Sequence, residues 1–105
     1  MTDIQQDTYT ISIAIIQHSD LAITNVVAPT EVESGEPFDI SYDVTNSGAE
    51  DSCYGHLWDN GTNNVVAGSR WEQTIANGET VTKTYTHTGI TAPFSGEIQV
   101  GYVKP

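Results

Sequence analysis

The chain has few positively charged residues, one cysteine and no long apolar run, and each shortage disfavours a class of function. Only three of its 105 residues are Lys or Arg, against fourteen Asp or Glu, for a formal net charge of −11. Such a surface repels phosphate backbones and anionic lipid headgroups, which disfavours binding to nucleic acid or to a membrane surface. No stretch approaches the roughly 18 apolar residues of a membrane span, so we expect no direct membrane insertion. The charge favours a solvated surface or a basic partner.

The single cysteine, Cys53, excludes an internal disulfide, and we interpret it as a small buried residue within a strand. The N-terminal residues are acidic and polar where a secretion signal would be basic and then apolar. We therefore expect a protein made in the cytoplasm, a component of a particle assembled there, or a domain taken from a longer secreted protein.

Helix-favouring leucine is also rare, with two residues, while threonine, valine, isoleucine and tyrosine are frequent. Residues 35–48 show a strand pattern in place of a helical one. Four apolar side chains there alternate with polar ones, namely Phe38, Ile40, Tyr42 and Val44. A strict period of two is typical of an antiparallel strand with one face on a core and the other in water. The Asn-Ser-Gly that follows tolerates positive φ and ends the strand in a turn.

Seven segments of this kind follow one another, with Gly, Asn and Pro between them and no helix. They are residues 8–17, 21–27, 37–46, 53–59, 65–71, 79–87 and 96–103. Strands about 8–12 residues apart with such turns predict an all-β sandwich or barrel. At 105 residues the chain is long enough for one domain with a single core, without disulfides or a metal.

The first segment, residues 8–17, is the most apolar and precedes the apparent start of the domain. One of its faces carries Tyr9, Ile11, Ile13 and Ile15. In polarity pattern residues 7–15 are similar to residues 95–103, so the segment looks like the closing strand of a sandwich placed before the opening one. Either two amphipathic strands are alike by chance, or this strand adds to a sheet edge of its own domain or of a neighbouring subunit. We therefore divide the chain into a strand extension, residues 1–17, that is a candidate assembly strand, and a sandwich, residues 18–105.

Several turn and strand motifs follow in order from residue 19 onward. They are Asp20-Leu21-Ala22-Ile23, Pro29, Gly35-Glu36-Pro37-Phe38-Asp39-Ile40, Val44-Thr45-Asn46-Ser47-Gly48, Ala76-Asn77-Gly78-Glu79-Thr80 and Gly96-Glu97-Ile98-Gln99-Val100. On these residues the chain, over about residues 19–103, resembles the CARDB family, the immunoglobulin-like cell-adhesion-related domains of bacteria and archaea. The resemblance implies an immunoglobulin-like Greek-key sandwich of about seven strands in extracellular surface proteins, with no shared catalytic residues. The extra strand and the missing signal differ from the family and leave room for a protein that decorates or builds a particle such as a virion.

No combination of residues points to catalysis. His18, His56 and His87 are far apart in the sequence and lack zinc-binding spacing. Neither Ser69 nor Cys53 lies in a nucleophile motif with a histidine placed beside it. Paired glycosidase carboxylates leave no local signature, but a sandwich of this size offers little cleft for a polymer. We therefore expect a protein that is not an enzyme.

Calcium is the one metal with local support, because it binds six to eight oxygen ligands and the chain has oxygen-rich loops. The best loop is residues 59–64, whose weak candidate ligands are Asp59, Asn60 and Asn63. This loop does not have EF-hand spacing, and Asn60-Gly61 explains it equally well as a hairpin turn. We expect no cofactor, with calcium as the weaker alternative.

Among the aromatic residues, Trp58 is expected in the core, because a Trp on the third strand anchors immunoglobulin-like sandwiches. Trp71, next to Arg70 near a strand end, is expected to be exposed, and these two residues are the candidate partner contact.

Two hypotheses follow for function. The first is a non-catalytic module displayed on a cell surface, which engages proteins or glycans as part of a longer extracellular protein. The second is a small structural subunit, such as a virion decoration protein or filament component, that pairs with copies of itself through residues 8–17. Both predict protein partners and no nucleic acid.

Overall fold

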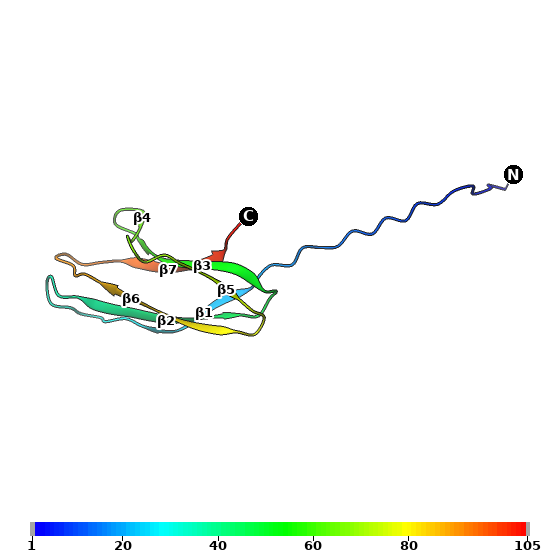
Figure 1. The fold of residues 1–105 in the computed structure, drawn as a ribbon. Helices are drawn as coiled ribbons and strands as arrows, with labels where there is room; N and C mark the ends of the chain where they lie inside the picture. Colours follow the sequence, from blue (N-terminus) through cyan, green and yellow to red (C-terminus); the bar gives the residue numbers. More distant parts are fainter. Residues whose placement is uncertain (1, 105) are drawn as a thin grey trace.

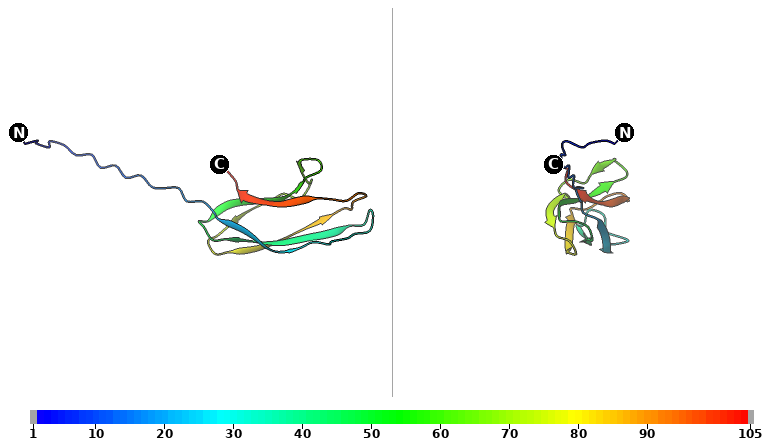
Figure 2. Two further views of the ribbon diagram at one scale, coloured as in Figure 1. Left: turned by 180° about the vertical axis from the view of Figure 1, so that it is seen from behind. Right: turned by 90° about the vertical axis from the view of Figure 1, so that its right-hand side faces the viewer.

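The computed structural model describes residues 2–104 as an all-β protein whose two antiparallel sheets face each other, as the layers of a β-sandwich do (Figures 1 and 2). The first sheet has the order β1 (Leu21–Val27), β2 (Phe38–Asn46) and β6 (Thr80–His87). The second contains β3 (Asp51–Asp59), β4 (Asn64–Val65), β5 (Trp71–Ile75) and β7 (Gly96–Tyr102). No helix that could span a membrane occurs among residues 2–104.

Strand β3 is the centre of the second sheet. Cys53 pairs both with Gln73 on β5 and with Tyr102 on β7, so these two strands lie on opposite edges of β3. The short β4 pairs with the far end of β3, on the same edge as β5. The chain crosses between the sheets after β2, after β5 and after β6.

Five of the seven expected strands agree with the structure to within two residues at each end. The expected strand at residues 65–71 is wrong. Strand β4 ends at Val65, Gly68 turns the chain with a φ of 77°, and the returning strand β5 begins only at Trp71. Residues 8–17 also form no strand in the single chain, because a strand needs a partner for its backbone and none of the described strands lies beside them.

The core forms where the inward faces of β2, β3 and β5 meet. Its fully enclosed members are Tyr42, Val44, Cys53 and Ile75. The alternation expected for β2 is confirmed, since Ile40, Tyr42 and Val44 are each at most 8% exposed. The expected burial of Cys53 is confirmed as well.

A buried asparagine joins the turns at one end of the sandwich. The Oδ1 of Asn46 accepts N–H groups from Asp20 and Gly48, at 3.0 and 2.9 Å. Its Nδ2 donates to the carbonyls of Ala49 and Ile75, at 2.8 and 2.9 Å. This one side chain therefore connects the start of β1, the β2–β3 turn and the end of β5.

The two long sides of the sandwich are closed to different degrees. Where β5 lies opposite β6, Lys83 donates to Gln73 Oε1, and the Tyr85 hydroxyl donates to the Ala67 carbonyl at 3.0 Å. Among residues 2–104 no side-chain hydrogen bond joins β1 and β7, and the nearby bonds of His18 and Ser19 go to Asp51 of β3. The β1/β7 side therefore lacks the side-chain hydrogen bonds that join the two sheets on the β5/β6 side, and we call it the open side.

Residues 2–17 run out from the sandwich as an extended strand-like arm (Figure 1). The radius of gyration is 22.0 Å, whereas a compact chain of this length has about 13 Å. The arm accounts for this difference, because the longest extent of the molecule, 86 Å, lies along it.

Candidate functional site

The arm of residues 2–17, called here the N-terminal segment, exposes more apolar surface than any other part of the chain. The side chains of Tyr9, Ile11, Ile13 and Ile15 are 74–90% exposed. Residues 8–17 also contain no charged side chain, although the chain has a net charge of −11. Isolated apolar side chains on a surface are ordinary, but a contiguous row of them marks an interaction site.

The N-terminal segment leaves the sandwich from a fixed point. The His18 ring stacks on Tyr102 at the end of β7, with 4.1 Å between ring centroids and 5° between planes. Its Nδ1 lies 2.9 Å from Asp51 Oδ2. Hydrogen bonding to His18 holds the pKa of the Asp51 carboxyl below its usual value. The backbone carbonyl of His18 accepts the N–H of Ala49 at 3.1 Å, so the point of exit is held on both sides.

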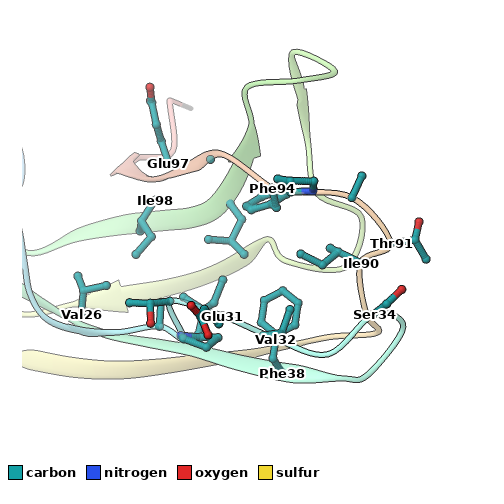
Figure 3. A pocket seen from close by; sticks show the side chains of 18 residues that line it. Val26, Glu31, Val32, Ser34, Phe38, Ile90, Thr91, Phe94, Glu97 and Ile98 are labelled. Carbon is teal, nitrogen blue, oxygen red and sulfur yellow. The ribbon is translucent and has the colours of Figure 1, made fainter.

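A groove of about 780 Å³ opens between the sheets at the opposite end of the sandwich (Figure 3). We call it the loop-end groove. Its walls come from the β1–β2 loop, the start of β2, the β6–β7 loop and the start of β7. Phe38 and Ile98 point into it from the two sheets, and Phe94 and Ile90 line the β6–β7 loop (Figure 3). Two of its lining residues, Glu31 and Glu97, carry carboxylates. The groove is therefore mainly apolar.

Trp71 is not the exposed contact that the sequence suggested. It is partly buried and packs against the core, and its Nε1–H donates to the Tyr42 hydroxyl at 2.7 Å. Burial raises the pKa of Tyr42, and the hydrogen bond from Trp71 opposes that effect. The Lys83 ammonium lies 4.7 Å from the Trp71 ring centroid. Its neighbour Arg70 is exposed and forms an ion pair with Glu72, and Arg70 and Trp71 both line a small pocket of about 130 Å³.

Trp58 is not in the core either. Because side chains alternate along β3, Cys53 and Leu57 point inward and Trp58 lies on the outer face, where it is partly buried. Trp71 therefore has the core position expected of Trp58. The outer face also holds His56, which is 8% exposed and whose Nε2 lies 2.9 Å from Gln99 Oε1.

The candidate calcium loop is organised as a turn. Asp59 Oδ1 accepts the N–H of Gly61 at 2.8 Å, and the N–H of Asn60 donates to the Ser95 carbonyl at 3.0 Å. Asn63 has a φ of 54°, the left-handed conformation that asparagine tolerates in turns. Among residues 2–104 no three His, Cys, Asp or Glu side chains come together as metal ligands would.

The residues considered for catalysis have separate structural partners. Ser69 Oγ accepts the N–H of Leu57 and donates to the Val66 carbonyl, at 3.0 and 2.7 Å. His87 stacks on Phe38 with 5.0 Å between ring centroids, whereas His18 stacks on Tyr102 and His56 contacts Gln99.

Sequence reasoning found the apolar row of the N-terminal segment but missed the loop-end groove and the role of Asn46. The groove is formed by side chains up to about 70 residues apart, which no local motif connects. The turn signal at Asn46 was visible, but its four hydrogen bonds depend on three separate parts of the chain.

Comparisons of the chain with protein-family models, with curated proteins and with solved structures find no match.

Proposed function

We propose that this protein is a non-catalytic structural subunit of a larger assembly and that the N-terminal segment is its assembly strand. The observation that carries the proposal is the row of four alternate apolar side chains, almost fully exposed on residues 8–17, which contain no charged side chain. Each such side chain contributes about 1.5–3 kcal/mol when it is buried. A row of alternate side chains suits a sheet edge, where one face of an added strand is buried and its backbone is paired.

The entropy cost of ordering the segment also favours a sheet edge over a flat apolar surface as its binding site. Ordering one residue costs about 1–2 kcal/mol in backbone entropy, so burial of every second side chain is largely offset. Backbone hydrogen bonds to a partner strand supply the remaining stabilisation and fix the register. The partner that this segment needs is therefore one with an unpaired strand.

For the sandwich we propose an immunoglobulin-like topology. The order β1-β2-β6 corresponds to strands A, B and E of such a domain, and β3 and β7 correspond to C and F on the other sheet. In that topology a further strand, G, lies beside F. No described strand occupies that place beside β7. The CARDB-like motifs of residues 19–103 support the same assignment.

The second candidate is an adhesion module on a cell surface, and the resemblance to CARDB domains is what favours it. In that case the protein engages other proteins or glycans as part of a longer extracellular chain. The assembly hypothesis instead predicts a site such as a virion surface or a filament. The two differ in whether purified chains bind to one another.

The test is the solution mass measured by light scattering over a wide range of concentrations, in about 0.5 M salt to screen the net negative charge. We expect the wild-type chain to form species larger than its monomer mass of 11.4 kDa. The double variant Ile11→Asp/Ile13→Asp is expected to remain a monomer, because it places charge on the face to be buried. The matched control, Thr10→Asp/Ser12→Asp, adds the same charge to the opposite face and should still assemble. A wild-type chain that stays monomeric at about 1 mM would favour the adhesion hypothesis.

A further inference from the structure

We propose that the N-terminal segment of one copy pairs with the open edge of β7 in a second copy, antiparallel to β7, so that copies join head to tail. This inference rests on the proposed function and specifies its acceptor site. The partner is another copy of this chain, and head-to-tail pairing of copies leads to an open filament.

The register of β7 identifies which of its backbone groups are available. At one end the Ser95 carbonyl accepts the N–H of Asn60, and at the other end the N–H of Val103 donates to the Ser52 carbonyl. The pairing of β3 with β7 is unbroken between these ends. Odd-numbered residues of β7 therefore bond to β3, and even-numbered residues direct their N–H and C=O groups to the open edge. These even-numbered residues are Gly96, Ile98, Val100 and Tyr102.

The space beside that edge is apolar. Ile98 and Val100 on β7 are only partly buried and pack at the margin of the core, as do Leu21 and Ile23 on β1. Strands β1 and β7 are in contact, so the four side chains border the open side of the sandwich. At the end of the β1–β2 loop lies the loop-end groove, which Val26 of β1 and Ile98 of β7 also line (Figure 3). The uncharged row of the N-terminal segment matches this lining.

The edges of β6 and β1 are less suitable. Beside β6 the side chains of Lys83 and Tyr85 reach across to the second sheet and close the space. Strand β1 has a break in register between Thr24 and Val27, with Asn25 at a φ of 51°. A bulge of this kind interrupts a ladder. Strand β7 is therefore the principal partner, with β1 on the other side of the added strand.

The point of exit favours a second copy over the segment's own domain. His18, held by Tyr102 and Asp51, releases the segment at the end of β7, directed away from the sandwich (Figure 2). To return to its own groove the chain would have to reverse immediately before His18. Extended, the 16 residues of the segment reach roughly 55 Å. The seven residues of β7 need only about 24 Å of that length.

The direction of pairing follows from these positions. A copy stacked in the same orientation presents its loop-end groove to the segment, which then enters antiparallel to β7 and parallel to β1. Folding back, or reciprocal exchange between two copies placed exit end to exit end, would make the segment parallel to β7. Antiparallel ladders are somewhat more stable per residue, so we assign the first arrangement. Such an interface is heterologous and does not close, so it generates filaments.

The first test uses a substitution on the acceptor edge. In Val100→Pro the lost N–H is one that points to the open edge, so the ladder with β3 keeps all its hydrogen bonds. We expect Val100→Pro to abolish assembly and the control Val100→Thr, which keeps the N–H, to assemble. An assembling Val100→Pro chain would overturn the acceptor assignment while leaving the assembly strand intact, provided that Ile11→Asp/Ile13→Asp remains monomeric.

The second test does not depend on how Val100→Pro folds. Amide hydrogen exchange is allowed to proceed in assembled wild-type chains and in the monomeric Ile11→Asp/Ile13→Asp variant. It is then quenched, and the exchange rate of each amide is compared between the two. The amides of Ile98, Val100 and Tyr102 should exchange at least about ten-fold more slowly in the assembly. Those of Thr82 and Thr84 point to the outer edge of β6 and should not change. Protection at β6 in place of β7 would overturn the proposal.

Direction is tested in a mixture of two full chains that cannot assemble alone. Isotope-labelled Ile11→Asp/Ile13→Asp supplies the open edge, and unlabelled Val100→Pro supplies an intact segment, so a 1:1 complex is expected. A nitroxide attached through D7C of the unlabelled chain should broaden signals near Tyr102. Broadening near Gly96 in its place would mean parallel pairing and would overturn the head-to-tail geometry.

Discussion

Strand β2 and the N-terminal segment carry similar apolar patterns and have opposite environments. In β2 the side chains of Ile40, Tyr42 and Val44 are almost completely buried, whereas the row from Tyr9 to Ile15 is almost completely exposed. The period of two is strict throughout β2, whereas in the N-terminal segment Ala14 and Ile16 place apolar side chains on the other face as well. The difference in environment is that β2 has a strand on each side and a facing sheet, while the segment has neither in the single chain. A strand pattern therefore specifies what kind of partner a segment needs and not whether its own domain provides one.

The largest expected contrast comes from the same substitution in each region. Val44→Asp places an unpaired charge in the centre of the core and should cost more than about 4 kcal/mol of unfolding free energy. Ile13→Asp should change the stability of the dilute monomer by no more than about 0.5 kcal/mol. Urea unfolding below the assembling concentration measures both. A cost above about 1 kcal/mol for Ile13→Asp would mean that the segment packs on its own domain.

A second contrast concerns the end of the sandwich from which the segment leaves. Asn46→Ala removes partners from four backbone groups and should cost about 2–4 kcal/mol. The control is Asn77→Ala in the neighbouring turn, where Nδ2 donates to the exposed carbonyls of Ser47 and Gly48. That change should cost less than about 1 kcal/mol. Equal losses for the two variants in urea unfolding would contradict the connecting role of Asn46.

The closed side of the sandwich supplies a smaller contrast. Trp71→Phe removes the hydrogen bond to the Tyr42 hydroxyl and part of the packing, so we expect a loss of about 1–2 kcal/mol. Trp58→Phe, on the outer face of β3, should cost less. Thermal or urea unfolding measures both losses. A larger loss for Trp58→Phe than for Trp71→Phe would contradict the placement of Trp71 in the core and Trp58 on the outer face.

The smallest effect is expected where the two regions meet. Because the pKa of Asp51 is lowered in the folded chain, its ionised form adds stability above the ordinary aspartate pKa of about 3.9. That stability is lost as the pH falls through the lowered pKa. Asp51→Asn should therefore reduce the decline in the urea midpoint between pH 5 and pH 2, and Glu50→Gln serves as the neighbouring control. An unchanged acid profile for Asp51→Asn would show that the His18 contact contributes nothing measurable.

Local sequence pattern was enough to place most strands, because alternation and turn residues act within a few positions. It failed at residues 65–71, where Val65 and Trp71 belong to two short strands separated by the turn at Gly68. It failed also for the two tryptophans. Both Trp58 and Trp71 suit a strand, and only the pairing of β3 with β5 decides which one faces Tyr42. Gly55 contributes to that choice, because the Trp71 ring lies where its Cβ would be.

For the candidate site too, one part could be predicted from the sequence and the other could not. The exposed row of the N-terminal segment was visible as Tyr9, Ile11, Ile13 and Ile15, since apolar alternation is a local property. Its proposed acceptor was not visible, because an open edge is defined by the strands that do not pair with it. Ile98 and Val100 look like ordinary core residues in the sequence, and only the topology leaves β7 paired on one side.

By itself, the sequence determined the all-β class, the approximate positions of most strands, the acidic surface and the presence of an uncharged apolar row near the N-terminus. These properties follow from side-chain chemistry and from a period of two, which operate over a few residues. The tertiary structure alone decided which strands pair, which tryptophan enters the core, where a groove opens and from which end the N-terminal segment leaves. Those outcomes depend on contacts between residues distant in the chain, and burial of one face settles them only when the whole set of strands is in place.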